Sequence, residues 1–202
     1  MELVAALRRR RMVRAFAPDP IDPDLIDHLL DLSRRAPSAG NSQGVSFVVL
    51  EGSATAQYWD ITLPAERRAS FRWQQLLDAP VIVLVCTNPT RYVERYAEAD
   101  KAKTGLGEAA DCWPVPYWWV DAGAVAQNLL LLAVDQQLGA CLFGPFDHEP
   151  AVAKHFRLPS QQRIVASIAL GHPLVDEPGR SATRDRPPIG EIILRPPPDP
   201  PH

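Results

Sequence analysis

The stretch Val81-Ile82-Val83-Leu84-Val85-Cys86 is apolar at every position and rich in β-branched residues. A strand with one face in water alternates apolar and polar side chains, whereas an unbroken apolar run of this length is typical of a strand that is covered on both faces. Asp78-Ala79-Pro80, just before it, ends the helix predicted upstream. We therefore expect a buried strand with other elements packed against each of its faces.

A second long apolar segment runs from Trp118 to Leu138 and predicts a helix that is apolar on nearly every side. We expect this helix in the centre of the molecule, ended by Gly139. Similar patterns predict helices over residues 2–10, 23–36, 54–63, 66–77 and 149–156, strands over 45–50, 140–143 and 164–170, and an irregular segment over 98–116. In the first helix Leu3, Val4 and Leu7 are expected to face inward.

The composition indicates one folded domain over residues 1–202. The chain has a mass of 22.3 kDa, 46% hydrophobic residues and 22% charged residues, which is neither a disordered nor a membrane-spanning composition. The apolar run from Leu129 to Val134 is too short to cross a bilayer, and the N-terminus lacks the apolar core of a signal peptide, so we expect a cytoplasmic protein. The net charge of -3 argues against a nucleic-acid partner.

The three cysteines, Cys86, Cys112 and Cys141, include no CxxC spacing. We therefore expect neither a disulfide framework nor a zinc site. His148-Glu149 is followed by His155 at the wrong spacing for a zinc-binding HExxH motif, so no metal site is predicted.

Two segments have the residues to bind an anion. Arg10 and Arg14 lie four residues apart around a predicted helix end, and the planar forks of two guanidinium groups suit a phosphate. Ser38 to Gln43 is a loop of turn formers with hydroxyls, amides and free backbone N–H groups. Taken singly, the first is more often a solvated basic helix end and the second an ordinary turn.

Taken together and in order, these segments resemble the nitroreductase family, over about residues 8 to 193. The matching places are Arg10–Phe16, Ala36–Gln43, Asp121–Leu129, Gly139–Cys141 leading to Gly144, and Leu170–Pro173 followed by a basic arm. The sequence departs from the family pattern at Met12, where many relatives carry Ser, and at Gly44-Val45, where many carry Pro-Trp.

The resemblance implies an α+β fold: three layers, α/β/α, with a mainly antiparallel sheet. It also implies an intertwined homodimer with a swapped C-terminal arm and FMN at the subunit interface. We assign the arm to residues 174–202, with 196–202 open to disorder. By position, the residues expected near the phosphate and pyrimidine edge of FMN are Arg10, Arg11 and Arg14, with Arg184 and Arg186 closing on the phosphate. Those expected near the ribityl chain, phosphate or ring are Ser38, Ala39, Asn41 and Gln43, while Phe143 and Gly144 present backbone N–H groups toward flavin N5.

The segment from Cys112 to Trp119 contains three of the five tryptophans, stiffened by Pro114 and Pro116. Its rings can form a wall of a substrate pocket, on which aromatic substrates would stack, or pack in a dimer core. We assign Trp113, Tyr117 and Trp118 to the pocket, and leave the packing interpretation open.

The sequence therefore predicts an FMN-dependent oxidoreductase that passes electrons from NADH or NADPH to a small oxidised acceptor, such as a nitroaromatic or a quinone, in two steps. The cofactor carries this chemistry, so no catalytic side chain is assigned. One alternative keeps FMN but changes the reaction to flavin fragmentation, dehalogenation or reduction by a deazaflavin. The other is a non-catalytic module that binds flavin or another anion.

Overall fold

The structure, a computed structural model, describes residues 1–175 and 179–195, except for the side chains of Arg180 and Ser181. Its sheet is antiparallel throughout, in the order β1, β5, β3, β2, with β4 also paired to β5. The strands are β1 (Phe16–Ala17), β2 (Val45–Glu51), β3 (Val81–Thr87), β4 (Gly139–Phe143) and β5 (Arg163–Pro173). The strands predicted at 45–50, 81–86, 140–143 and 164–170 are therefore confirmed, whereas the two-residue strand β1 was not foreseen.

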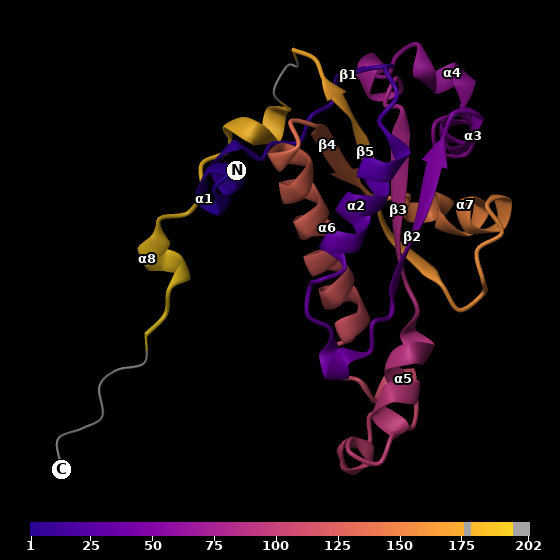
Figure 1. The fold of residues 1–202 in the computed structure, drawn as a ribbon, viewed down its shortest axis with the longest axis vertical. Helices are drawn as coiled ribbons and strands as arrows, with labels where there is room; N and C mark the ends of the chain where they lie inside the picture. The colour runs from indigo at the N-terminus through magenta and orange to yellow at the C-terminus, as the bar shows by residue number, and fades with distance from the viewer. Residues whose placement is uncertain (176–178, 196–202) are drawn as a thin grey trace.

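Helices cover both faces of this sheet (Figure 1). One face carries α2 (Pro23–Ser33) and α6 (Tyr117–Asp135), and the other carries α3 (Ser53–Thr62) and α7 (Glu149–His155). Alternate residues of β3 enter the two cores: Val83 packs on the side of α2 and α6, and Leu84 on the opposite side. Every residue of β3 is buried. The three-layer α/β/α arrangement and the strand covered on both faces are confirmed.

The predicted helix over residues 66–77 is wrong in extent. The chain forms one turn, α4 (Ala65–Arg68), and then a 3₁₀ turn at Gln74–Leu76. Side chains there bond to backbone carbonyls: Gln74 Nε2 donates to Phe71 O at 2.8 Å, inside the predicted helix, and Arg68 Nε donates to Leu63 O at 3.0 Å, just before it. Such local bonds compete with the helical ladder. The helix α5 (Pro89–Ala97) was not predicted.

The N-terminal helix α1 (Leu3–Arg9) forms where predicted, but its apolar side chains do not point into the chain's own core. Leu3, Val4 and Leu7 are 64%, 58% and 50% exposed, and only Ala6 is buried. The reason is that α1 lies beside α6 rather than over the sheet, with the terminal amino group paired to Asp135. The prediction that these side chains of α1 face inward is therefore wrong for a single chain.

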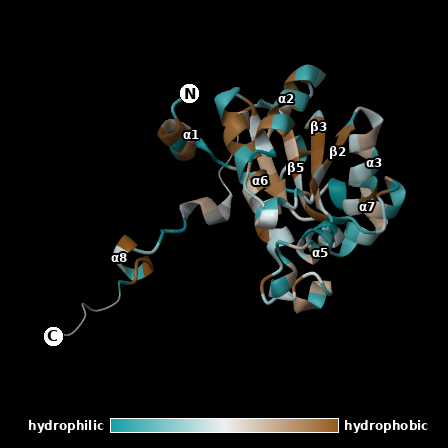
Figure 2. Ribbon diagram, turned by 60° about the horizontal axis from the view of Figure 1, so that its bottom comes forward, coloured by the Kyte–Doolittle hydropathy of each residue, from teal (hydrophilic) through white to brown (hydrophobic). Residues whose placement is uncertain are grey.

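The central helix is also different from its prediction. It covers one face of the sheet as an outer layer, so Trp119 and Val120 remain 37% and 52% exposed. Figure 2 shows α1 and the C-terminal segment extending away from the three layers. There Ile189–Ile192 form a short helix, α8. The swap of this arm remains a prediction, and residues 176–178 and 196–202 lie outside the described residues.

Within residues 1–175 and 179–195, no helix is long and apolar enough to span a bilayer. The same residues contain no cluster of His, Cys, Asp and Glu suited to a metal ion. Cys86 and Cys141 are buried thiols, and Cys112 is exposed.

Candidate functional site

The loop that follows α2 has a tightly specified backbone. Gly40, Asn41 and Gln43 have positive φ angles of 61°, 56° and 50°, a conformation that glycine and asparagine tolerate best. At Gly40 a β-carbon would also lie only 2.7 Å from the ring of Tyr96. The backbone turns back on itself here, so side chains and peptide groups of residues 38–43 are gathered at one edge of the molecule.

Three hydrogen bonds hold this loop in place. The Ala39 amide donates to Asp121 Oδ2 at 2.9 Å, the Gln43 amide donates to Ser38 Oγ at 3.0 Å, and Arg95 Nε donates to Gly40 O at 2.8 Å. Asp121 comes from the first turns of α6 and is 6% exposed. Asp121 therefore has a structural role, because it joins the start of α6 to the backbone of the loop.

A fully buried tyrosine lies under the same loop. Tyr92, on α5, packs against Trp113 and Trp118, and a β-carbon at Gly44 would lie only 2.3 Å from its ring. Burial, and then the neighbouring Asp121 carboxylate, raise the pKa of the Tyr92 hydroxyl well above its usual range. Gly44, which departs from the family's Pro-Trp, is thus required by this aromatic packing.

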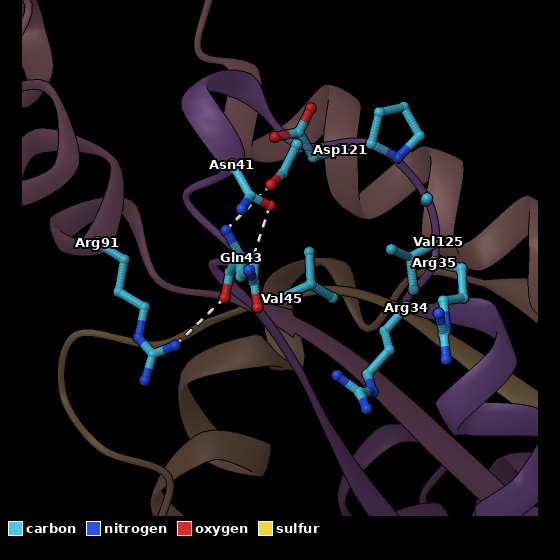
Figure 3. A pocket seen from close by; sticks show the side chains of 11 residues that line it. Arg34, Arg35, Asn41, Gln43, Val45, Arg91, Asp121 and Val125 are labelled. Atoms are coloured by element: carbon cyan, nitrogen blue, oxygen red, sulfur yellow. Dashed lines mark hydrogen bonds between the residues drawn. The ribbon is translucent and has the colours of Figure 1, made fainter. Parts of the chain in front are cut away.

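The loop forms one wall of a hollow of about 660 Å³, a size typical of small-molecule sites. Figure 3 shows Arg34 and Arg35 on one side, Arg91 on the opposite side, and Gln43 and Val45 between them. The lining residues are Arg34, Arg35, Ala36, Pro37, Ser38, Asn41, Gln43, Val45, Arg91, Asp121 and Val125. Of the predicted cofactor residues, the structure brings Ser38, Asn41 and Gln43 together here.

A second hollow, of about 420 Å³, contains Arg14 with Arg72, Trp73 and Gln74 in its lining. The guanidinium carbons of Arg14 and Arg72 lie 5.0 Å and 5.6 Å from the centre of the Trp73 ring, close enough for cation–π attraction. The lining of this hollow combines two arginines with an aromatic ring, a combination that suits a planar anionic ligand.

The other basic residues of the N-terminal motif have separate positions. Arg10 ends α1, and its Nη1 is buried without a hydrogen-bond partner in the described part of the chain. Arg11 lines a different hollow, next to Val13 and Gln137. Met12 is partly buried and packs against both hydrophobic clusters, and its sulfur accepts from Leu142 N at 3.4 Å. This packing explains why an apolar residue stands where relatives carry Ser.

The remaining predicted cofactor residues lie outside these two hollows. Phe143 ends β4, and its ring stacks on Trp59 with centroids 5.5 Å apart. Gly144 follows it directly. Arg184 and Arg186 are exposed, on the C-terminal segment between the turn at Arg180–Thr183 and α8.

Two of the three predicted substrate-pocket residues are packed inside this chain. Trp113 and Trp118 are 5% and 6% exposed and pack edge-on with each other and with Tyr92, while Trp113 Nε1 donates to Leu106 O at 2.9 Å. Tyr117 is 45% exposed at the start of α6. Of the three, Tyr117 alone offers substantial ring surface to a ligand in the single chain.

Sequence analysis missed several residues at these sites. Arg34 and Arg35 directly precede the polar loop, so their neighbourhood in sequence was a usable signal. Arg91 and the segment Arg72–Gln75 reach their hollows only through the folding of α5 and of the turn after α4, and no local pattern marks them.

Comparison with known proteins agrees with the geometry. The model of the nitroreductase family matches residues 7–172. A 4-nitrobenzoate reductase of Pseudomonas putida is 30% identical over 190 residues, covering 83% of this chain and 84% of that protein. An NADH dehydrogenase of Thermus thermophilus is 30% identical over 192 residues, covering 86% and 87%.

Two solved structures illustrate the likeness of the fold. A nitroreductase family protein from Streptococcus pneumoniae superposes with a TM-score of 0.75 at 21% identity, covering 96% of this chain and all of that chain. A protein from Desulfovibrio desulfuricans, described as a putative nitroreductase in complex with FMN, superposes with a TM-score of 0.67 at 25% identity, covering 98% of each chain.

Proposed function

Because the chain belongs to the nitroreductase family, we propose that it is an FMN-dependent oxidoreductase that passes electrons from NADH or NADPH to a small oxidised acceptor such as a nitroaromatic or a quinone. The relatives described as 4-nitrobenzoate reductase and NADH dehydrogenase, and the neighbour solved with FMN, support both the cofactor and the reaction class. Bound FMN supplies the redox chemistry by accepting hydride from the nicotinamide and then reducing the acceptor.

The residues present fit this cofactor. The single observation that carries the proposal is the buried Nη1 of Arg10, which has no partner in the described part of the chain. A buried guanidinium N–H without an acceptor is costly, and a phosphate oxygen is the acceptor that it suits best. Arg14 over Trp73 supplies a second cation beside an aromatic surface.

The polar loop would hold the cofactor through its polar side chains and not through the backbone groups of Ala39. The amide of Ala39 is bonded to Asp121, and its carbonyl accepts from both the amide and the hydroxyl of Ser42. Because both of its backbone groups are bonded, Ala39 can contact the cofactor only through its apolar methyl group. Ser38, Asn41 and Gln43 line the hollow with polar side chains and are the loop residues that we propose bind FMN or a substrate.

We further propose that two chains share each site. Large apolar side chains are left exposed on α1, on the outer face of α6, on α8 and directly after it: Leu3, Val4, Leu7, Trp119, Val120, Ile189, Ile192 and Ile193. An isolated soluble chain would be expected to cover such surfaces. In a homodimer they would be buried, and Phe143, Gly144, Arg184 and Arg186 would approach the cofactor together with residues of the partner subunit. Tyr117 would then form part of the acceptor pocket.

The test is the visible spectrum of the purified protein. We expect flavin absorbance that bleaches under anaerobic conditions when NADH or NADPH is added and returns when 4-nitrobenzamide is added. The released flavin should be FMN by chromatography. Arg10→Ala should reduce the FMN retained by about tenfold, the loss of roughly one charge-assisted hydrogen bond. A protein that neither retains nor takes up FMN would contradict the proposal.

A further inference from the structure

Three guanidinium groups from two separate helices surround the 660 Å³ hollow beside the polar loop. Arg34 and Arg35 follow the last turn of α2, and Arg91 lies in the first turns of α5. Figure 3 shows them on opposite sides of the hollow. A planar ligand lying over Val45 and Val125 would therefore have arginines at either end. None of these three arginines belongs to the family-like cofactor motifs.

The three arginines are not equally available. Arg34 is paired with Asp31 on its own helix. Arg91 donates from Nη1 to Gln43 O at 3.3 Å, which leaves its other N–H groups without a bond in the described part of the chain. The backbone amide of Arg35 donates to Leu32 O at 3.1 Å, but its guanidinium group forms no hydrogen bond or ion pair with residues 1–175 or 179–195. Arg35 and Arg91 are thus the two cations that a ligand can engage without displacing a carboxylate.

The lining contains one carboxylate to offset this charge, Asp121, among the residues that the structure describes. It is 6% exposed and already accepts the Ala39 amide, so it faces the loop backbone as well as the hollow. The hollow therefore carries an excess of positive charge although the whole chain has a net charge of -3. A local positive field of this kind attracts anions to the hollow, although the net negative charge of the whole chain repels them.

We propose that Arg35 and Arg91, on opposite sides of the hollow, each offer a cation to an anionic group carried by a substrate, which makes the site selective for negatively charged small aromatic compounds. The inference rests on the proposed function, because the same hollow is the one lined by the polar loop. The shared chemistry is a planar ring bearing an oxyanion. The FMN phosphate is assigned to Arg10 and Arg14 by the proposed function. The remaining oxyanion has two sources in this reaction: a carboxylate on the ring of the aromatic acceptor, or the ribose 2′-phosphate that distinguishes NADPH, which also carries planar rings, from NADH.

The test measures binding and turnover separately. The acceptor arm compares 4-nitrobenzoate with 4-nitrobenzamide, which has nearly the same shape and no charge. The donor arm compares NADPH with NADH. Each arm is measured on the FMN-loaded protein by calorimetry and by kcat/KM, in the wild type and in Arg35→Gln, Arg91→Gln and Arg35→Lys. Arg67→Gln, an exposed arginine on α4 that lines neither hollow, is the control for net charge.

In one of the two arms, we expect the preference for the compound with the extra anionic group, 4-nitrobenzoate or NADPH, to fall about five- to tenfold in Arg35→Gln and in Arg91→Gln. This is the effect of losing one partly exposed charge-assisted hydrogen bond. Arg35→Lys should retain most of the preference and Arg67→Gln all of it. A fall in the 4-nitrobenzoate preference identifies the acceptor as the anion, and a fall in the NADPH preference identifies the donor.

Equal binding of the charged and neutral compounds in the wild type, or unchanged preferences in both variants, overturns the inference. Assays with the neutral compounds distinguish failure of this inference from failure of the proposed function. If NADH and 4-nitrobenzamide support turnover but no charge preference exists, the inference alone fails. If neither donor reduces the loaded protein, the proposed function fails, while calorimetry still decides whether Arg35 and Arg91 bind anions.

Discussion

The Asp121 carboxylate links the first turns of α6 to the polar loop through the Ala39 amide. Its position is buried, and water cannot replace the bond when the carboxylate is removed. The neighbouring Tyr92 hydroxyl is also buried, with its pKa raised by that burial and by Asp121. One side chain therefore sets the conformation of the loop that presents Ser38 and Asn41 to the hollow.

We expect Asp121→Ala to lower the free energy of unfolding by about 1–3 kcal/mol, because it leaves a buried N–H donor without an acceptor. Asp121→Asn keeps an acceptor oxygen and should cost less. Urea unfolding monitored by tryptophan fluorescence measures both. The exposed Asp111→Ala, in the turn at Ala110–Cys112, is a suitable control and should change stability by less than about 0.5 kcal/mol. Equal stability of Asp121→Ala and the wild type would contradict this role.

Single residues differ in how far the sequence specifies them. Asp22 is recognisable as an N-cap because its partner, the Asp24 amide, is two residues away, and the bond is present at 3.0 Å. The orientation of Leu7 was predicted wrongly because an amphipathic helix specifies an apolar face but not what covers it. Arg91 could not be assigned to a site, since its neighbour there, Gln43, is 48 residues away in the chain.

At the scale of elements, an ion pair links α7 to β5 in addition to the apolar packing of Val152. Glu149, the first residue of α7, accepts from Arg163 Nε and Nη2 at 2.8 Å and from the Ile164 amide at 3.0 Å. The hydrogen bond from Arg163 holds the pKa of Glu149 below its usual range. The carboxylate therefore contributes stability above a pH of about 4.3, the ordinary pKa of glutamate, and this contribution is lost as pH falls through the lowered pKa.

We expect Glu149→Gln to cost about 0.5–1 kcal/mol at pH 7, a value reduced for the solvent screening of a partly exposed pair. The difference from the wild type should shrink steadily below pH 4. Thermal unfolding from pH 3 to pH 8 measures the trend. Glu94→Gln, an exposed change on α5, should show no such pH dependence. A cost that stays constant across this range would mean that packing, and not the charge, accounts for it.

The elements themselves could be predicted where their pattern is local. The complete burial of β3 follows from an unbroken apolar run, and the helix α6 follows from a long apolar segment. The helix over residues 66–77 failed because Gln74 and Arg68 bond to nearby carbonyls, which periodicity does not reveal. The aromatic cluster of Tyr92, Trp113 and Trp118 joins α5 to α6, and only the tertiary fold brings these rings together.

At the scale of the whole molecule, the apolar surfaces of α1 and α8 form few contacts with the chain that carries them, and Figure 2 shows both helices standing away from the layers. The resemblance to a family predicted a shared dimer with an exchanged arm, and no sequence pattern specifies which surfaces meet. The exposed leucines of α1 offer a direct way to test whether α1 is part of the interface.

We expect the wild type to sediment at twice the chain mass of 22.3 kDa. The double variant Leu3→Glu/Leu7→Glu should sediment at the mass of one chain, because two charges would be buried in the proposed interface. If two chains share each site, the same variant should lose most of its bound FMN while keeping its far-ultraviolet circular dichroism. Ala69→Glu, which adds a charge to an exposed position just after α4, should remain dimeric and retain FMN. A monomeric variant that still holds FMN would show that the cofactor site is complete within one chain. Arg10 would then bind the FMN phosphate together with residues of its own chain alone.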